Sequence, residues 1–240
     1  MEQITDHFET NPTRVYTASR THLQTQRIIT GFTPGKWLES YKMLRTRCLQ
    51  IMDANQWNTL AITSPNSESG NSLTATNLAI SIAMEFNRSV LLIDANFQNP
   101  GICKLLNIKS KEGLSHYLTD STPLKDLLVS IDVDHLSILP AGKAILNSAE
   151  LLRSPKMLAL IAELKNNDPN RIIIFDLPPL LSQDDTLGFV PAVDCLLLVV
   201  DEGHTKLEEL KQSATLLKDI NVLGTILNKS SDNKIQYQIN

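Results

Sequence analysis

Three short segments of the sequence place polar residues directly after an apolar run. They are "TSPNSESGNSLT" at residues 63–74, "IDANFQNP" at 93–100 and "FDLPPLL" at 175–181. The first is framed like a loop that binds phosphate through its backbone N–H groups and then runs into a helix. The other two carry Asp94 and Asp176, each at the end of an apolar stretch. The chemistry these segments indicate is the binding of a phosphorylated ligand, provided that the loop still holds the residues which contact phosphate.

The elements that would position these segments are short strands alternating with helices. Six apolar runs predict strands that are buried on both faces, as in a parallel sheet. They are "TLAITS" (59–64), "SVLLID" (89–94), "LSILPA" (136–141), "RIIIFD" (171–176), "CLLLVV" (195–200) and "VLGTIL" (222–227). Helical spacing lies between them, for example at Leu78, Ile82 and Phe86. This alternation predicts a doubly wound α/β fold, in which ligands bind beyond the carboxyl ends of the strands.

Composition limits the class of protein. The 240 residues suit one medium α/β domain, and the net charge of −4 without a dense Lys/Arg run argues against a nucleic-acid partner. Cys48, Cys103 and Cys195 show no metal or redox spacing and predict a reducing compartment. The longest apolar run, residues 195–200, is far short of the roughly 20 residues that span a membrane. The first ten residues have neither a basic start nor an apolar core, so we expect no signal peptide.

Both ends of the chain differ from its centre. Residues 1–34 are polar and Thr-rich without periodicity, which predicts a flexible or partner-dependent arm. Residues 35–229 carry the strand and helix patterns and form the predicted domain, and residues 230–240 form a short polar tail.

The three strand-end segments resemble, in order and spacing, the Walker A, Walker A′ and Walker B segments of the bacterial tyrosine autokinases (the CpsD/CapB and Wzc cytoplasmic domains), a branch of the MinD/ParA-like P-loop ATPases. Further collinear matches are "ESYKMLRT" (39–46), "GLSHYLTD" (113–120), "LPAGKAILNSAELLRSPKM" (139–157) and "LGTILNK" (223–229). The resemblance covers roughly residues 35–229 and implies a P-loop NTPase fold with a mainly parallel sheet.

The resemblance implies a nucleotide site whose phosphate contacts have decayed. The family loop reads much like S-P-x-P-G-x-G-K-[ST], and here Ser69, Gly70, Asn71 and Ser72 occupy its last four positions. Asn71 stands in place of the lysine that bridges the β- and γ-phosphates, and Glu68 replaces a glycine. Because a charge-assisted contact contributes about 1.5–3 kcal/mol, we expect ATP binding to be weak or absent.

The acidic segments are also only partly preserved. Asp94 matches the first acid of the family's I-D-A-D-x-R-x-P, whereas Asn96 replaces the second acid and Gln98 the arginine. The resemblance implies that Ser72, Asp94 and Asp176 remain as the Mg²⁺ and catalytic set. The alternatives are that the two aspartates only terminate strands and that Ser72 only caps a helix.

Two other sets of residues gain a role through the resemblance. By family analogy Asn228 faces an adenine, although a plain polar strand end explains it nearly as well. Glu39, Lys42 and Arg45 recur at i, i+3 and i+6 on an amphipathic helix at residues 36–48, with Lys42 at the first Arg position of the family's E-x-x-R-x-x-R. This charged row is either a solvated face or, as the family implies, the interface of a homo-oligomer.

The resulting function is a tyrosine-autokinase-like regulator or scaffold with impaired catalysis in exopolysaccharide or capsule synthesis. It would be cytoplasmic, beside a membrane-embedded chain-length or export component that the N-terminal arm could contact. The alternative is an active autokinase with a lysine from elsewhere, such as Lys42 or Lys143, although the tail offers only Tyr237 for phosphorylation. A MinD/ParA-type positioning ATPase ranks third, because the chain shows neither a membrane-seeking tail nor a basic face.

Overall fold

The computed structural model describes residues 14–30, 35–120, 122–145, 148–182, 184–230 and 237–238. The rest of the predicted arm, at residues 1–13 and 31–34, and most of the predicted tail lie outside the described residues.

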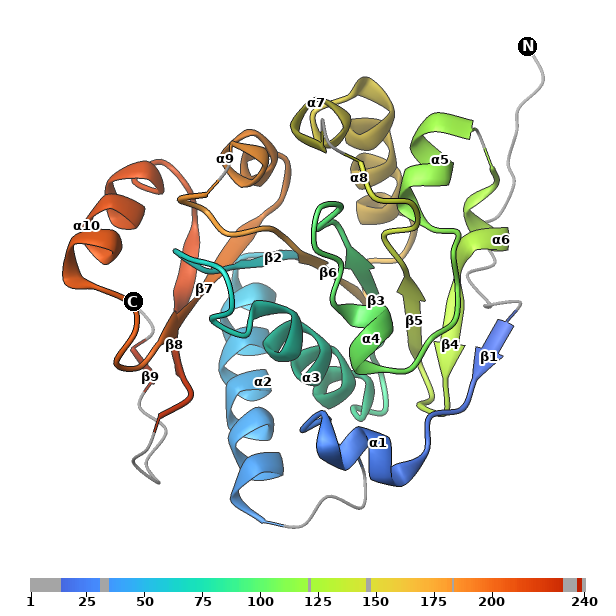
Figure 1. Ribbon diagram of the computed structural model, residues 1–240, viewed down its shortest axis with the longest axis horizontal. Helices are drawn as coiled ribbons and strands as arrows, with labels where there is room; N and C mark the ends of the chain where they lie inside the picture. The colour runs from blue at the N-terminus through green and yellow to red at the C-terminus, as the bar shows by residue number, and fades with distance from the viewer. Residues whose placement is uncertain are drawn as a thin grey trace.

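A nine-stranded sheet runs through the centre of the molecule in the order β1-β4-β5-β3-β6-β2-β7-β8-β9 (Figure 1). The strands are β1 (Arg14–Tyr16), β2 (Thr59–Thr63), β3 (Ser89–Asp94), β4 (Val129–Ile131), β5 (Leu136–Leu139), β6 (Arg171–Asp176), β7 (Cys195–Asp201), β8 (Val222–Asn228) and β9 (Tyr237–Gln238). Only the β4–β5 and β8–β9 pairs are antiparallel. The prediction of a mainly parallel, doubly wound α/β fold is confirmed.

Helices cover both faces of this sheet (Figure 1). One layer contains α1 (Arg20–Thr25), α2 (Lys36–Ala54), α3 (Asn71–Ala83) and α4 (Ile102–Leu105). The other contains α5 (Leu114–Asp120), α6 (Leu124–Leu127), α7 (Ser148–Leu152), α8 (Pro155–Asn167), α9 (Asp185–Phe189), the short 3₁₀ helix η1 (Val190–Ala192) and α10 (Leu207–Leu216). Neighbouring side chains of a strand enter opposite layers, as Leu60 and Ile62 do on one face and Ala61 on the other.

Helix α3 is shorter than its predicted apolar face. Leu78 and Ile82 are fully buried, but the helix ends at Ala83 and the side chain of Phe86 is 92% exposed. The prediction that Phe86 packs with them is therefore wrong, because the chain leaves helical geometry before it returns Phe86 to the core side.

Part of the segment predicted to be a flexible arm packs against the domain. The three residues of β1 pair with β4, and Ile28 and Ile29 are buried beside α3. The amide of Asn77 holds this segment, since its Oδ1 accepts from the Ile29 N–H at 2.9 Å and its Nδ2 donates to the Arg27 carbonyl at 3.0 Å. Because the side chain that holds this segment belongs to α3, the polar segment needs no periodic apolar pattern of its own.

Among the residues that the structure describes, no helix combines the length and the apolar character needed to cross a lipid bilayer.

Candidate functional site

The predicted site residues meet at the carboxyl ends of the central strands. The loop after β2 leads into α3, and β3 and β6 lie on the same side of β2 in the sheet order. Asp94 and Asp176 are direct neighbours in the register of β3 and β6. The topology therefore gathers the three segments that the sequence singled out.

The loop adopts left-handed backbone geometry at two positions. Gly70 has φ 91°, and a Cβ added to it would lie 2.3 Å from Nδ2 of Asn228. Glu68, which stands where the related family has a glycine, has φ 64°. A non-glycine residue in this conformation is held against an intrinsic cost of roughly 1–2 kcal/mol. The loop thus has left-handed backbone geometry at residue 68 while carrying a side chain there.

Asn71 turns its side chain inward, toward the end of β6. Its Nδ2 donates to the carbonyl of Leu177 at 2.7 Å and lies 3.3 Å from Oδ1 of Asp176. The residue is buried, so the amide at the lysine position is engaged by the protein itself.

Asp94 and Asp176 form a buried pair of carboxylates. Asp94 accepts from the backbone N–H groups of Asn96 at 3.2 Å and Ile102 at 3.1 Å, yet its burial raises its pKa to about 7. Burial also raises the pKa of Asp176, the charge of Asp94 adds to this, and a hydrogen bond with Ser72 opposes it. Two adjacent acids without a counter-charge favour a shared proton or a bound cation.

The donor set fits a magnesium ion. Oδ2 of Asp176 is buried and has no hydrogen-bond partner within the described residues. Together with Asp94 and the hydroxyl of Ser72 it offers the oxygen ligands that Mg²⁺ prefers. No group of three His, Cys, Asp or Glu side chains suited to a metal occurs in the described part of the chain, so the set depends on Ser72. The structure brings the three residues together, and their binding of Mg²⁺ stays a prediction.

The two replacements in the second segment are built into the local structure. Oδ1 of Asn96 accepts from the backbone N–H of Asn99 at 3.1 Å, and Gln98 donates from Nε2 to the hydroxyl of Ser148 on α7 at 3.1 Å. Asn96 and Gln98 therefore tie the loop after β3 to itself and to α7.

The sequence did not point to Lys229 and Asp201, which also belong to this site. Nζ of Lys229 donates to the carbonyl of Glu68 at 2.7 Å and to Oδ2 of Asp201 at 2.8 Å. Beside it, Nδ2 of Asn228 donates to the carbonyl of Ser69 at 2.8 Å. Both residues stand at strand ends, as Asp94 and Asp176 do, and this position is the signal that could have found them.

One of the two lysines proposed as substitutes from the sequence has its side chain engaged elsewhere. Lys42 pairs with Glu39 on the surface of α2 at 3.0 Å, and the backbone N–H of Lys143 donates to the hydroxyl of Ser115. Lys229 contacts the loop instead. That Asn228 faces an adenine stays a prediction.

The charged row on α2 divides between two environments. Glu39 and Lys42 are exposed, with their ion pair on the surface. The side chain of Arg45 is only 15% exposed, because it pairs with Glu85 at 2.7 Å and donates to the carbonyl of Ser81 at 3.0 Å. Arg45 therefore connects α2 to α3 and its end within one chain.

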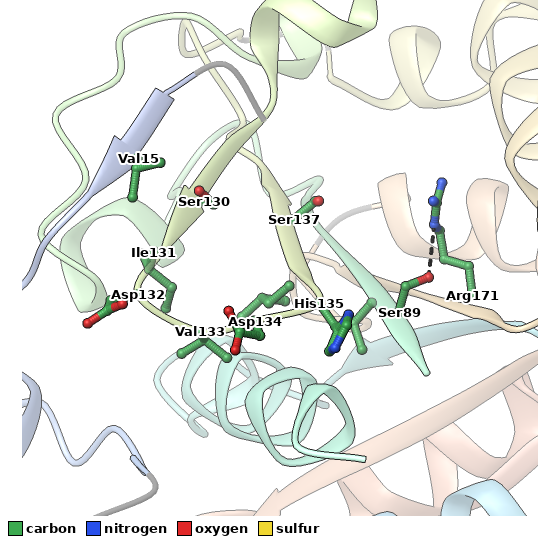
Figure 2. Close-up of a pocket in the computed structure, with 12 residues that line it drawn as sticks. Val15, Ser89, Ser130, Ile131, Asp132, Val133, Asp134, His135, Ser137 and Arg171 are labelled. Carbon is green, nitrogen blue, oxygen red and sulfur yellow. Dashed lines mark hydrogen bonds between the residues drawn. The ribbon is translucent and has the colours of Figure 1, made fainter. Parts of the chain in front are cut away.

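A separate pocket of about 430 Å³ opens at the amino ends of β3, β5 and β6, the opposite end of these strands from the loop. Asp132, Asp134 and His135 line it from the turn between β4 and β5, and His135 lies on the side of Ser89 and Arg171 (Figure 2). Arg171 donates to Ser89 Oγ at 3.3 Å, so part of its lining is structural.

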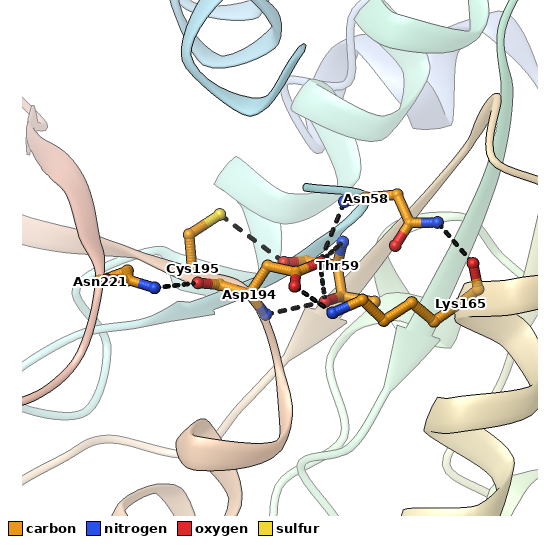
Figure 3. A network of polar contacts seen from close by, with 6 residues as sticks. All are labelled: Asn58, Thr59, Lys165, Asp194, Cys195 and Asn221. Atoms are coloured by element: carbon orange, nitrogen blue, oxygen red, sulfur yellow. Dashed lines mark hydrogen bonds and ion pairs between the residues drawn. The ribbon is translucent and has the colours of Figure 1, made fainter. Parts of the chain in front are cut away.

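A polar network fastens the amino ends of β2 and β7 (Figure 3). Oδ2 of Asp194 accepts from the backbone N–H groups of Asn58 and Thr59 at 3.0 Å and from the Thr59 hydroxyl at 2.7 Å. Lys165 of α8 bonds the other carboxylate oxygen. The network therefore connects α8 to the amino end of β2, the strand that leads into the loop, and to that of its neighbour β7.

Comparison with known proteins places these features in a family. No protein-family model matches the sequence. The chain is 30% identical to the tyrosine-protein kinase YwqD of Bacillus subtilis, over 85% of this chain and 86% of YwqD. It is 32% identical to the tyrosine-protein kinase CpsD of Streptococcus agalactiae, over 74% of this chain and 77% of CpsD. It is 31% identical to the succinoglycan biosynthesis transport protein ExoP of Rhizobium meliloti, over 87% of this chain but only 27% of ExoP.

Solved structures agree with this relationship. The kinase domain of the Escherichia coli tyrosine kinase ETK superposes with a TM-score of 0.75 at 25% identity, over 94% of this chain and 93% of that domain. The chimerical protein CapA2B2 gives 0.78 at 22% identity, over 92% and 95% of the two chains. MinD of Pyrococcus horikoshii, complexed with Mg-ADP, gives 0.61 at 22% identity over 75% and 74%, which shows a shared fold. The chain belongs to the bacterial tyrosine-protein kinases, a family built on the MinD-like P-loop fold.

Proposed function

We propose that the protein is a catalytically impaired member of this kinase family that acts as a regulator or scaffold in the synthesis and export of exopolysaccharide or capsule. The inward-facing amide of Asn71 carries the proposal, because it bonds Leu177 and Asp176 at the position where the related kinases hold a lysine. The similarity to a succinoglycan transport protein supports the process.

The binding energy and the rate enhancement that the missing lysine would contribute are large enough to impair catalysis in a protein that keeps its fold. A missing charge-assisted contact costs about 1.5–3 kcal/mol, or roughly 10- to 100-fold in affinity. An electrostatic stabiliser of the transferring group contributes about 100- to 1000-fold in rate. The exposed carboxylate of Glu68 adds repulsion toward a phosphate at the same loop.

We further propose that Mg²⁺ and a nucleotide bind weakly at the retained half of the site. Ser72, Asp94 and Asp176 would hold the ion, which would offset the charge of the buried carboxylates and of a phosphate. Gly70 would let the loop backbone approach that phosphate, because it carries no side chain.

Calorimetric titration with Mg·ATP tests the proposal. The unaltered protein should bind at least ten times more weakly than an Asn71→Lys, Glu68→Gly double variant, since the double variant restores the cation and removes the carboxylate. The matched control, Asn71→Met, Glu68→Gly, carries at residue 71 an uncharged side chain about as long as lysine. It should therefore lack the part of the gain in Mg·ATP affinity that comes from the lysine's charge. Micromolar binding by the unaltered protein would contradict the proposal.

An active autokinase is the second candidate, and the contact of Lys229 with the loop favours it. In that case the unaltered protein should incorporate phosphate from labelled ATP onto tyrosine, and Lys229→Met should abolish this. Absence of label on Tyr237 and on an added peptide substrate, at saturating Mg·ATP, would exclude this candidate.

For partners, we propose a homo-oligomer that works at the cytoplasmic face of a membrane-embedded export component. The exposed pair of Glu39 and Lys42 offers a surface for a second copy, whereas Arg45 is engaged within the chain. A Glu39→Ala, Lys42→Ala variant should lower the oligomer mass in light scattering and keep its melting temperature. Arg45→Ala should lower the melting temperature. An unchanged mass for the double variant would assign the row to a solvated face.

A further inference from the structure

Two consecutive residues at the end of β8 hold two consecutive carbonyls of the loop. Asn228 donates to Ser69 at 2.8 Å, and Lys229 donates to Glu68 at 2.7 Å. These contacts join segments about 160 residues apart in the sequence. They hold the loop from the side of β7 and β8, away from Asp94 and Asp176 on β3 and β6.

The two residues of the Lys229–Glu68 contact both have unusual backbone geometry. Glu68 has φ 64° and Lys229 has φ 57°, in the left-handed region that residues with side chains rarely adopt. Such conformations persist where surrounding contacts over-determine them. At Glu68 the contact is with its own carbonyl, so it acts directly on the peptide unit that follows the strained residue.

The ammonium group of Lys229 is itself anchored. Its Nζ lies 2.8 Å from Oδ2 of Asp201, whose side chain is 6% exposed at the end of β7. Moving Lys229 away would leave this buried carboxylate with only the exposed side chain of His204, 3.6 Å from its other oxygen, as a charged partner in the described residues. The lysine thus links two strand ends of the sheet to the loop.

The same loop also lies close to α10. The pKa of Glu209, in the first turn of α10, is lowered chiefly by the backbone N–H of Lys206 and to a smaller extent by the side chain of Asn66 in the loop. The hydrogen bonds that hold the loop nevertheless come from the end of β8.

We propose that Lys229 is a positioning residue which, anchored by Asp201, keeps the loop around Glu68 in its left-handed turn and so preforms the phosphate-loop shape without glycine at residue 68. The role concerns the loop alone. It requires no nucleotide binding and stands or falls independently of the proposed function.

Cleavage by a glutamyl endopeptidase tests this role at the bond concerned. The enzyme cuts after glutamate, and the carbonyl of Glu68 is the group that Lys229 holds. Cleavage of a native protein follows the population of the opened segment. In the full chain, Lys229→Met should increase the rate of cleavage after Glu68, relative to the exposed Glu112 in the same molecules, on the order of tenfold. Asp201→Asn, which removes the anchor, should give a smaller increase.

Two controls separate positioning from general loosening. Lys229→Arg, which can still donate to both oxygens, should restore the ratio, and Lys218→Met, on the surface after α10, should leave it unchanged. An unchanged ratio in Lys229→Met would overturn the proposal. A rise at Glu68 and Glu112 together would also overturn it, because it would show that Lys229 supports the whole fold.

Discussion

Gly70 is the loop residue at which two constraints meet. Its φ of 91° disfavours any side chain, and Nδ2 of Asn228 occupies the space where a Cβ would lie. Gly203 has a similar φ of 77° but nothing within 4 Å of the same position. Substituting each of the two glycines therefore separates the energetic cost of backbone strain from that of steric contact.

We expect Gly70→Ala to destabilise the protein by about 1–3 kcal/mol more than Gly203→Ala does, because only the first forces Asn228 to move. The free energy of unfolding in urea measures both. Adding Asn228→Ala to Gly70→Ala should recover part of the difference. Equal losses for the two glycines would contradict the contact.

The buried pair of Asp94 and Asp176 predicts an unusual dependence on pH. Burial raises both pKa values, that of Asp94 to about 7, so the pair stabilises the fold while protonated and loses this stability as pH rises from about 4 through 7. Asp176→Asn removes one charge at nearly constant shape. It should raise the melting temperature at pH 8, by roughly 2–4 °C for each kcal/mol relieved, and change it little at pH 4.

Magnesium provides the matched check on the same pair. Millimolar Mg²⁺ at pH 8 should raise the melting temperature of the unaltered protein and leave that of Asp176→Asn almost unchanged, because the ion would take over the neutralisation. If both proteins respond equally, the ion acts elsewhere on the surface.

Residues differ in how far the sequence could identify them. Asp94 and Asp176 each end an apolar run, and parallel strands bring such ends together, so the strand-end rule found them, whereas Ser72 was identified by the resemblance of its loop to that of the family. Lys229 obeys the same rule, but its role depends on a backbone carbonyl 161 residues away, and no local pattern reports such a contact.

At the scale of elements, continuous apolar runs identified the six central strands, because a strand that is buried on both faces must be apolar at nearly every position. The same reasoning missed β1 and α1. These elements are short and polar. β1 is held by pairing with β4, and the residues that follow α1 are held by Asn77 of α3, so neither element needs a periodic apolar face of its own.

The network around Asp194 fixes where β2 and β7 begin. Burial alone would raise the pKa of Asp194, but Lys165 and the donors of Thr59 and Asn58 outweigh it and lower the pKa. The stability it contributes is present above the usual Asp pKa of 3.8 and is lost as pH falls through the lowered value.

We expect Asp194→Asn to cost about 2–3 kcal/mol at pH 7, because buried N–H groups of Asn58 and Thr59 lose a charged acceptor. The loss should shrink only as pH falls below 3.8 and through the lowered pKa of Asp194, where the unaltered carboxylate is itself protonated. Lys165→Met should cost less than about 1 kcal/mol, since the lysine is partly exposed. Urea unfolding at pH 7 and at about pH 2.5 compares them, and a pH-independent loss would contradict a role for the charge.

At the scale of the whole molecule, the N-terminal segment crosses one face of the sheet from an edge strand to the central helix α3. It leaves β1 at the outer edge of the sheet, passes through α1 and reaches α3 with Ile28 and Ile29 (Figure 1). If residues 14–30 were a partner-dependent arm, their removal or weakening would leave the domain intact. The buried isoleucines argue that this part of the chain completes the core beneath α3.

We expect Ile29→Ala to destabilise the isolated protein by about 2–5 kcal/mol, because the side chain is fully buried and its own N–H is fixed by Asn77. Val15→Ala on β1 is the matched control, since Val15 is 70% exposed, and it should change stability by less than about 0.5 kcal/mol. Urea unfolding without any partner protein measures both. Equal, small losses would show that the segment is dispensable for folding and free to serve as an arm, whereas the expected difference assigns Ile29 to the core of the domain.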